Sequence, residues 1–333
     1  MASAQSQFEE FHTKILMGYE DNEPLCSRRD TLKKELRDKL SKDLPGFDFF
    51  LQGSYALHTG IVPLGGNPDI DIGIIFECSP SDNDYKDPLK LKKIIKDALS
   101  TKNRTVRIKK PCVTVEYLRN EEVIYHIDLA IYSCEGGDSE KQTYLARGRD
   151  SSPADEILWE KSSARELTEK ILEKYEDKAD RKQYRRVIRY LKRWKDVKIG
   201  HKNAPSVGLT VGAYDLFSNN FDFTSGKPND LLALLSLVNL LLNNWGGDER
   251  LHIYSPVEPF SDLFSRMTDT QMTDFKTKLE KLSSVLTEAR DEPDTYEACK
   301  LLSSQFGDDF PIPEKKDTTK NSIPSVIPAG RSA

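Results

Sequence analysis

Hydrophobic and polar residues alternate along this chain with two different periods, and the change of period predicts two kinds of structure. From residue 47 to 133, short apolar runs have the two-residue period of β-strands, with one helical pattern at 86–100. Elsewhere the apolar residues recur every three or four positions, which predicts helices. The predicted helical segments are 5–43, interrupted near 22–24, and then 153–176, 180–196, 206–218, 231–245, 260–290 and 293–305.

The order of these patterns predicts an α+β fold, with a mixed sheet and a separate helical domain. We expect an N-terminal helical segment at 1–45 that spans both lobes, a sheet-containing core at 46–150 and a helical domain at 151–310. A cleft is expected between the last two. Residues 311–333 carry Pro, Lys and Ser without apolar periodicity, which predicts a disordered tail.

The predicted strand at 69–76 (DIDIGIIF) begins with two acidic residues. Side chains alternate between the two faces of a strand, so Asp69 and Asp71 point to one face while Ile70 and Ile72 point to the other. Two carboxylates about 7 Å apart along a strand repel each other, and a bound cation relieves that repulsion. An isolated pair of aspartates is more often part of a solvated face, so a metal site is predicted only if the flanking residues support it.

A small-residue turn precedes the acidic pair. Gly53 has no Cβ to block the approach of an anion, and Ser54 adds a hydroxyl. The residues from Tyr55 to His58 are then expected to form the first turn of a short helix, whose amino end favours phosphate. A phosphate cradle followed by a carboxylate pair is what metal-assisted phosphoryl or nucleotidyl transfer requires.

A third carboxylate is expected from a neighbouring strand. In the segment 122–133, Asp128 is the only acid within the apolar run from Val123 to Tyr132. A carboxylate in a buried strand is costly unless it is paired or metal-bound, which favours a functional role. His126 shares its face, and we interpret it as a hydrogen-bonded or structural residue because magnesium sites prefer oxygen ligands.

Basic residues gather at 181–202, where an amphipathic helix is predicted. Arg185, Arg189 and Lys192 follow one another three or four residues apart and share one side of it. Most of these cations are expected to be solvated, but a stripe facing a carboxylate–metal site would suit a triphosphate. Ser206, directly after a proline, is expected to cap the next helix.

Composition narrows the class of protein. The chain has 333 residues, of which 37% are hydrophobic and 31% charged, and no apolar stretch reaches the length of a membrane span. The five cysteines have no CxxC spacing, so neither a disulfide framework nor a zinc site is predicted. With no signal peptide at the amino terminus, a cytoplasmic location is expected. The net charge of −5 argues against a protein that coats nucleic acid.

The Gly-Ser pair, the acidic pair and the later acid resemble the signature of the polymerase-beta-like nucleotidyltransferase superfamily. Together with "RVIRYLKRWKD", "PSVGLTVGAYDLF" and "LLSSQFGDDFP", they resemble the cGAS/DncV-like nucleotidyltransferases (CD-NTases) over roughly residues 40–311. The resemblance implies a nucleotidyltransferase core with a helical domain. It also implies two Mg²⁺ ions, with Mn²⁺ as a substitute, at Asp69, Asp71 and Asp128. By the same resemblance, triphosphate contacts are expected at Gly53, Ser54, Lys192 and Ser206.

The same resemblance implies a function. Members of this group join NTPs into a cyclic di- or trinucleotide second messenger, which activates a downstream effector in anti-phage (CBASS) signalling. This chain departs from the group at Val207, where an aromatic residue often stacks on a base; Tyr214 is a candidate ring. It lacks a Cys/His insert, so no nucleic-acid activator is expected. The tail ending in PAGRSA resembles the substrate of a companion conjugating enzyme.

Two other functions would use the same aspartates. A template-independent RNA or tRNA nucleotidyltransferase should carry a more basic surface than this net charge gives, and a nucleotidyltransferase antitoxin that modifies a partner is normally shorter. A catalytically inactive binding module is expected to lose an acid, and all three are present here. The choice of NTPs, the 2′–5′ or 3′–5′ linkage, the ring size, the activating signal and the oligomeric state stay open.

Overall fold

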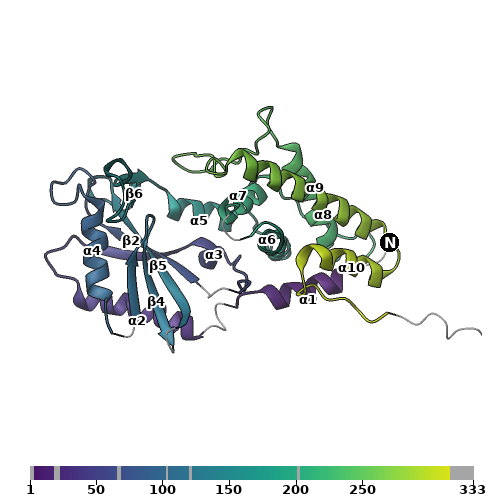
Figure 1. Cartoon of the computed structure of the whole chain (residues 1–333), viewed down its shortest axis with the longest axis horizontal. Coiled ribbons are helices and arrows are strands. Elements are labelled where there is room, and N and C mark those ends of the chain that lie inside the picture. The colour runs from purple at the N-terminus through teal and green to yellow at the C-terminus, as the bar shows by residue number, and fades with distance from the viewer. Residues whose placement is uncertain are drawn as a thin grey trace, which may run out of the picture.

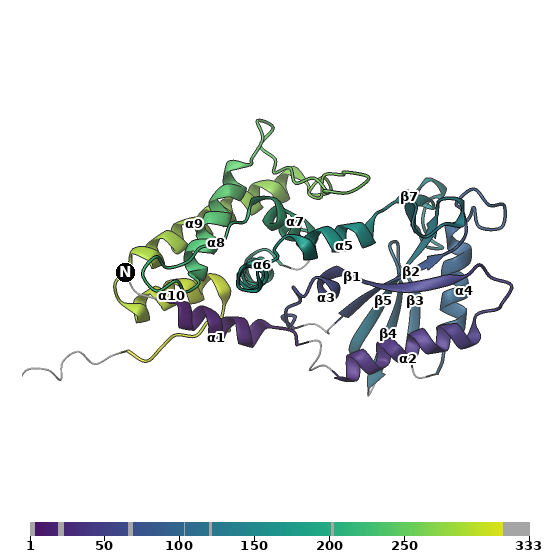
Figure 2. The same ribbon diagram turned by 180° about the vertical axis from the view of Figure 1, so that it is seen from behind.

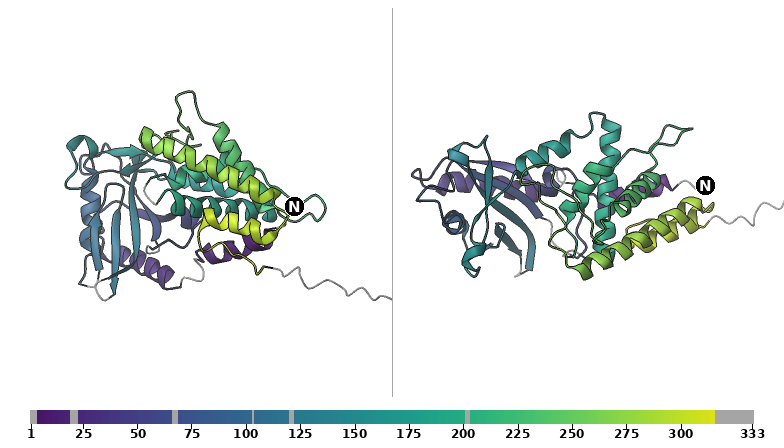
Figure 3. Two further views of the ribbon diagram at one scale, coloured as in Figure 1. Left: turned by 45° about the vertical axis from the view of Figure 1, so that its right-hand side comes forward. Right: turned by 90° about the horizontal axis from the view of Figure 1, so that it is seen from above.

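The structure is a computed structural model that describes residues 4–18, 23–65, 69–102, 104–119, 122–200 and 203–315. A β-sheet with two covering helices forms one half of the molecule, and a group of helices forms the other (Figure 1). Seen from above, the two halves lie side by side (Figure 3). The fold is therefore α+β, as the order of the sequence patterns predicted.

Seven strands form one mixed sheet. The strand order is β1-β2-β5-β4-β3, with β6 added beside β5 and β7 beside β6. β2 and β5 run parallel, and the other neighbouring pairs are antiparallel. The strands are β1 (Phe47–Gln52), β2 (Asp69–Phe76), β3 (Arg104–Ile108), β4 (Val113–Arg119), β5 (Glu122–Cys134), β6 (Thr143–Ala146) and β7 (Trp159–Lys161).

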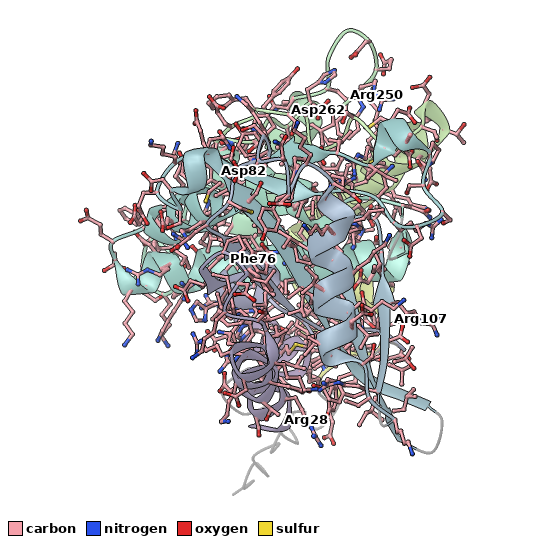
Figure 4. The ribbon with its side chains drawn as sticks, turned by 90° about the vertical axis from the view of Figure 1, so that its left-hand side faces the viewer. Arg28, Phe76, Asp82, Arg107, Arg250 and Asp262 are labelled. Carbon is pink, nitrogen blue, oxygen red and sulfur yellow. The ribbon has the colours of Figure 1, made fainter. Side chains whose placement is uncertain are left out.

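One face of this sheet packs on α2 (Glu23–Lys39) and α4 (Pro88–Leu99). The alternate residues Ile70, Ile72 and Ile74 of β2 are fully buried under these helices, as the alternation predicted. Figure 4 views this covered side, with Arg28 of α2 at its lower end and Arg107 of β3 at its outer edge. The polar residues of β2 therefore lie on the opposite face.

The helical half has a core that includes α1 (Gln5–Ile15) from the amino-terminal end of the chain. Phe8 and Phe11 of α1 pack against Tyr190 of α6, with ring centroids 5.1 and 5.3 Å apart. The region predicted as helical at 5–43 is thus a helix pair, α1 and α2. The other helices of this half are α5 (Ala164–Glu173), α6 (Lys178–Lys198), α7 (Ser206–Leu216), α8 (Asp230–Asn243), α9 (Asp269–Asp291) and α10 (Thr295–Phe306).

Three short elements complete the chain order. They are α3 (Gly53–Ala56), directly after β1, and the 3₁₀ turns η1 (Glu135–Gly137) and η2 (Ala154–Glu156). α5 follows β7 in the chain and lies between the sheet and α7 (Figure 2). In the parts of the chain that the structure describes, no helix is both long and apolar enough to cross a membrane.

Two predicted helices begin later than expected. The segment 153–176 contains η2 and β7, and its helix α5 starts only at Ala164. The segment 260–290 is irregular until Thr268, whose hydroxyl accepts from the backbone of Gln271, while the Gln271 side chain accepts from the backbone of Thr268. This capping box sets the start of α9 at Asp269. Residues 316–333 of the predicted tail lie outside the described residues.

Candidate active site

A cavity of about 830 Å³ is lined by residues of both halves of the molecule. Its sheet wall comes from the end of β1, from α3, from the acidic start of β2 and from the middle of β5, and its other wall comes from α5, α6 and α7. The structure brings every predicted site residue to this cavity: Gly53, Ser54, Asp69, Asp71, Asp128, Lys192 and Ser206.

The three aspartates lie on adjacent parallel strands. Asp71 of β2 stands directly opposite Asp128 of β5 in the strand register, and Asp69 stands opposite His126. Because neighbouring strands lie about 4.8 Å apart, carboxylates at paired positions on one face are close neighbours. The alternation of polar and apolar residues seen in the sequence therefore produces one acidic surface at the cavity wall.

Asp71 is the most perturbed of these carboxyl groups. Burial, followed by the nearby charges of Asp69 and Asp128, raises the pKa of Asp71 from its usual 3.8 to about 8. The ionised form of Asp71 is therefore electrostatically unfavourable, and a divalent cation between the carboxylates would stabilise it. The donors are all oxygen atoms, the ligand type that Mg²⁺ prefers.

The carboxylates do not converge by themselves. Within the described ranges, no three His, Cys, Asp or Glu side chains are grouped as a preformed metal cluster. Asp128 instead accepts a hydrogen bond of 2.5 Å from Thr114 Oγ1, and Lys109 Nζ lies 4.0 Å from the same carboxylate oxygen. Ionised carboxylates repel one another, so these three would come together around a metal only when the bound cation offsets that repulsion.

Thr114 was missed by the sequence analysis. It is fully buried on β4 and stands opposite Asp128 in the register. The alternation of residues 113–119 would have assigned it to a face of its strand, but only the pairing of β4 with β5 brings it to the acid.

Gly53 is required by its surroundings. Its φ of +68° is in the region that L-residues rarely adopt, and a Cβ here would lie 2.2 Å from Asp71 Oδ2. The backbone thus passes directly beside the buried carboxylate. The short helix begins at Gly53 itself, two residues earlier than the expected start at Tyr55.

Lys192 is buried at the cavity wall, with 6% of its surface exposed. Its Nζ donates to the carbonyl and the hydroxyl of Thr59, at 3.1 and 3.0 Å. Burial, followed by the charges of Arg189 and Lys195, lowers the pKa of Lys192 to about 7.

The predicted stripe of solvated cations on α6 is wrong as a surface feature. Arg189 is buried, with 7% of its surface exposed, and it donates to the carbonyls of His58 and Gly60. Arg189 is buried because α6 crosses the middle of the helical half. Periodicity in the sequence does not show which helix takes that central place.

Ser206 has a different local role from the one predicted. It is the first residue of α7, and the capping position is Pro205, so its side chain makes no cap hydrogen bond. Its Oγ accepts instead from Lys195 Nζ at 2.8 Å, and Lys195 also pairs with Asp196 at 3.1 Å. Sequence reasoning missed Lys195, which is 2% exposed and lies on the α6 surface that meets α7.

The residues considered for stacking on a base differ in whether they line the cavity. Val207 lines the cavity and is 43% exposed, whereas Tyr214 is not among the described lining residues, so its candidacy as a stacking ring is not supported. Tyr132 does line the cavity, and its hydroxyl donates to Gln52 Oε1 at 2.8 Å. His126 also reaches the lining, beside Asp69.

Comparison with known proteins finds a related domain and a distant curated relative. Residues 47–132 match the family model described as "Cyclic GMP-AMP synthase DncV-like, nucleotidyltransferase domain". Over this segment, the chain is similar to the DncV-like nucleotidyltransferase domain. A curated relative, the cyclic GMP-AMP synthase of Escherichia albertii, is 29% identical over 205 residues, which cover 57% of this chain and 43% of that protein. The chain thus matches less than half the length of this relative.

Solved structures share the fold. The Vibrio cholerae di-nucleotide cyclase DncV, in a mutant form with ATP, GTP and 5MTHFGLU2, has a TM-score of 0.70 at 16% identity and covers 92% of this chain and 97% of its own. The CD-NTase CdnG of Bradyrhizobium diazoefficiens with GTP has a TM-score of 0.71 at 16% identity, covering 92% and 96%. Escherichia coli MS115-1 CdnC with ATP has a TM-score of 0.69 at 17% identity, covering 93% and 99%.

Proposed function

We propose that this chain is a metal-dependent nucleotidyltransferase that joins NTPs into a cyclic di- or trinucleotide. The observation that carries the proposal is the cavity of about 830 Å³, which has three aspartates on its sheet wall and Lys192 and Ser206 on the facing helices. A chamber with acids on one side and a cation on the other suits a metal–triphosphate complex.

The acidic wall is assigned the metal-binding role. Asp69, Asp71 and Asp128 hold two Mg²⁺ ions in this proposal, with Mn²⁺ as a substitute, and the raised pKa of Asp71 supports it. Bound divalent ions would neutralise the triphosphate and make an acceptor hydroxyl more acidic. Asp128, which accepts a hydrogen bond from the hydroxyl of Thr114, would orient the acceptor hydroxyl.

The other predicted site residues are assigned to triphosphate binding. Gly53 leaves the backbone bare beside Asp71, and Ser54 adds a hydroxyl next to it. Lys192 contributes a positive charge from the other wall. Ser206, whose oxygen accepts from Lys195, keeps its own O–H to donate to a phosphate oxygen.

Cyclisation and signalling enter the proposal through the relatives. DncV and the Escherichia albertii protein are named for cyclic dinucleotide synthesis. After one transfer, a linear product that turns over in the cavity would place its own hydroxyl beside Asp128 for the second transfer. We infer that the product activates a downstream anti-phage effector and that no nucleic-acid activator is required.

Incubation with labelled ATP, GTP, CTP and UTP plus Mg²⁺ tests the proposal. Phosphatase-resistant products with the mass of cyclic di- or trinucleotides are expected from the purified chain without added RNA. Products that appear only when RNA is added would favour the RNA-type nucleotidyltransferase instead. Label transferred to a protein partner would favour the antitoxin.

A further inference from the structure

The loop that follows α3 is held along one edge by three cationic side chains of α6. We call residues 58–62 the strap. Arg193 Nη2 donates to Val62 O at 2.7 Å, Arg189 donates to two strap carbonyls, and Lys192 donates to Thr59. The strap is therefore bound mainly through its backbone carbonyls, with one further bond to the Thr59 hydroxyl.

The end of α1 holds the other edge of the strap. Met17 N donates to Gly60 O at 3.4 Å, and Val62 N donates to Ile15 O at 2.9 Å. With α6 on one side and α1 on the other, the strap is a fixed support. A side chain carried by it is consequently held in a defined place.

Thr59 is the strap residue that meets Lys192 twice. It is fully buried and accepts from Lys192 Nζ with both its carbonyl and its hydroxyl. An ammonium has three N–H donors, so these two bonds use at most two of them. Lys192 lines the cavity, where a bound acceptor could take up the remaining donor.

Charges of both signs surround Lys192. Burial, followed by the charges of Arg189 and Lys195, weakens its hold on its proton, and the carboxylates of Asp196 and Asp69 act in the opposite direction. A buried ammonium with cationic neighbours is costly unless acceptors surround it. The Thr59 oxygens and the nearby carboxylates supply part of this stabilisation, and a phosphate oxygen would add to it.

We propose that Thr59 is a positioning residue: by accepting two N–H bonds of Lys192, it fixes the ammonium so that the third N–H donates to a phosphate oxygen in the cavity. The inference rests on the proposed function only in taking the cavity as a triphosphate site. It makes Thr59 part of the phosphate-binding arrangement although it touches no ligand.

Tripolyphosphate with Mg²⁺ is the probe, because it presents the phosphates without a base or sugar. Thr59→Val keeps the shape of the side chain and removes the hydroxyl, so calorimetry should find binding about tenfold weaker. Thr59→Ser, which keeps the hydroxyl, should bind as the wild type does. Thr277→Val makes the same chemical change on the exposed surface of α9 and should also leave binding unchanged.

A double-mutant cycle separates positioning from mere packing. In a Lys192→Met background, Thr59→Val should cause no further loss of tripolyphosphate binding. Should Thr59→Val fail to fold, Thr59→Ala takes its place in the same cycle. An equal loss in both backgrounds, no loss in a folded Thr59 variant, or no binding by the wild type would overturn the proposal. Tripolyphosphate binding without any nucleotide product would refute the synthase and leave the positioning role standing.

Discussion

At the scale of single residues, Asp71 gives the site its most sensitive property. Its folded-state pKa of about 8 is raised far above the usual 3.8, so the folded protein holds this proton more tightly than the unfolded chain does. The stabilisation by the protonated form is complete below pH 4 and is lost as the pH rises through about 8. Stability without divalent ions should therefore fall over that interval.

Asp71→Asn tests this linkage, because asparagine cannot ionise. In EDTA, the variant should melt at a higher temperature than the wild type at pH 8, by ~2 °C or more, and the difference should shrink towards pH 4. Added Mg²⁺ should stabilise the wild type and not the variant. The measurement is thermal unfolding followed by circular dichroism across this pH range; parallel curves for the two proteins would contradict the assignment. The variant should also make no product.

The second residue-scale prediction concerns Lys192 and the choice of its control. Lys192→Ala should weaken NTP use chiefly through a raised KM, by about tenfold, if the contact is equally strong in the ground and transition states. Arg186 on the same helix is unsuitable as a control, since it forms a bidentate pair with the fully buried Asp230. Removing it would leave a buried carboxylate unpaired.

Lys182 is the matched control for that experiment. It is an exposed cation on α6, and the same truncation there should leave KM and kcat unchanged. The measurement is the steady-state KM and kcat of both variants. Equal effects of the two substitutions would mean that α6 acts through its overall charge alone.

What the sequence could predict at this scale was local. Strand alternation was enough to assign Asp69 and Asp71 to one face, and their strand does present that face to the cavity. The bond from Thr114 to Asp128 could not be predicted, because it depends on which strands pair. The same holds for Lys195 and Ser206, which meet only because α6 packs against α7.

At the scale of elements, periodicity predicted which segments are helical better than it predicted where they begin. α4 begins at Pro88, where Asp87 accepts from the backbone of Leu89, so a local signal marked the boundary. The helix predicted from 153 begins instead at Ala164, because the segment 159–161 pairs with β6 as an edge strand. Edge pairing is a long-range effect that a local pattern does not report.

The start of α9 gives a prediction at this scale. Thr268→Ala removes the hydroxyl that accepts from Gln271 N at 3.2 Å, and the loss of such a cap costs about 1 kcal/mol. Urea unfolding should show that decrease, while nucleotide synthesis should be unchanged because α9 does not line the cavity. Thr273→Ala, inside the same helix, is the control and should cost much less. Equal losses would mean that the capping box does not set this boundary.

At the scale of the whole molecule, the cavity and the last described residues, which end at Lys315, lie in different places. The cavity is formed where the sheet meets α5, α6 and α7, whereas the last described residues run beside α1 and α10 (Figure 1). Lys315 lies 3.7 Å from Glu297 of α10 and 5.4 Å from the Tyr296 ring. Residues 316–333, where the resemblance predicts a substrate for a conjugating enzyme, lie outside the described residues.

This separation predicts that conjugation and catalysis can be uncoupled. Deleting residues 327–333 should leave the KM and kcat of the purified protein unchanged, because the last described residues lie beside α10 and do not line the cavity. The same deletion should abolish attachment of the chain to other molecules by a companion conjugating enzyme, if that enzyme recognises the small residues of this segment. Replacing Lys315 by alanine, which removes its described contacts with α10, is the control and should change neither activity. Loss of nucleotide synthesis on deletion would show that the end of the chain supports the cavity, and conjugation of the shortened chain would show that the enzyme recognises another part of the molecule.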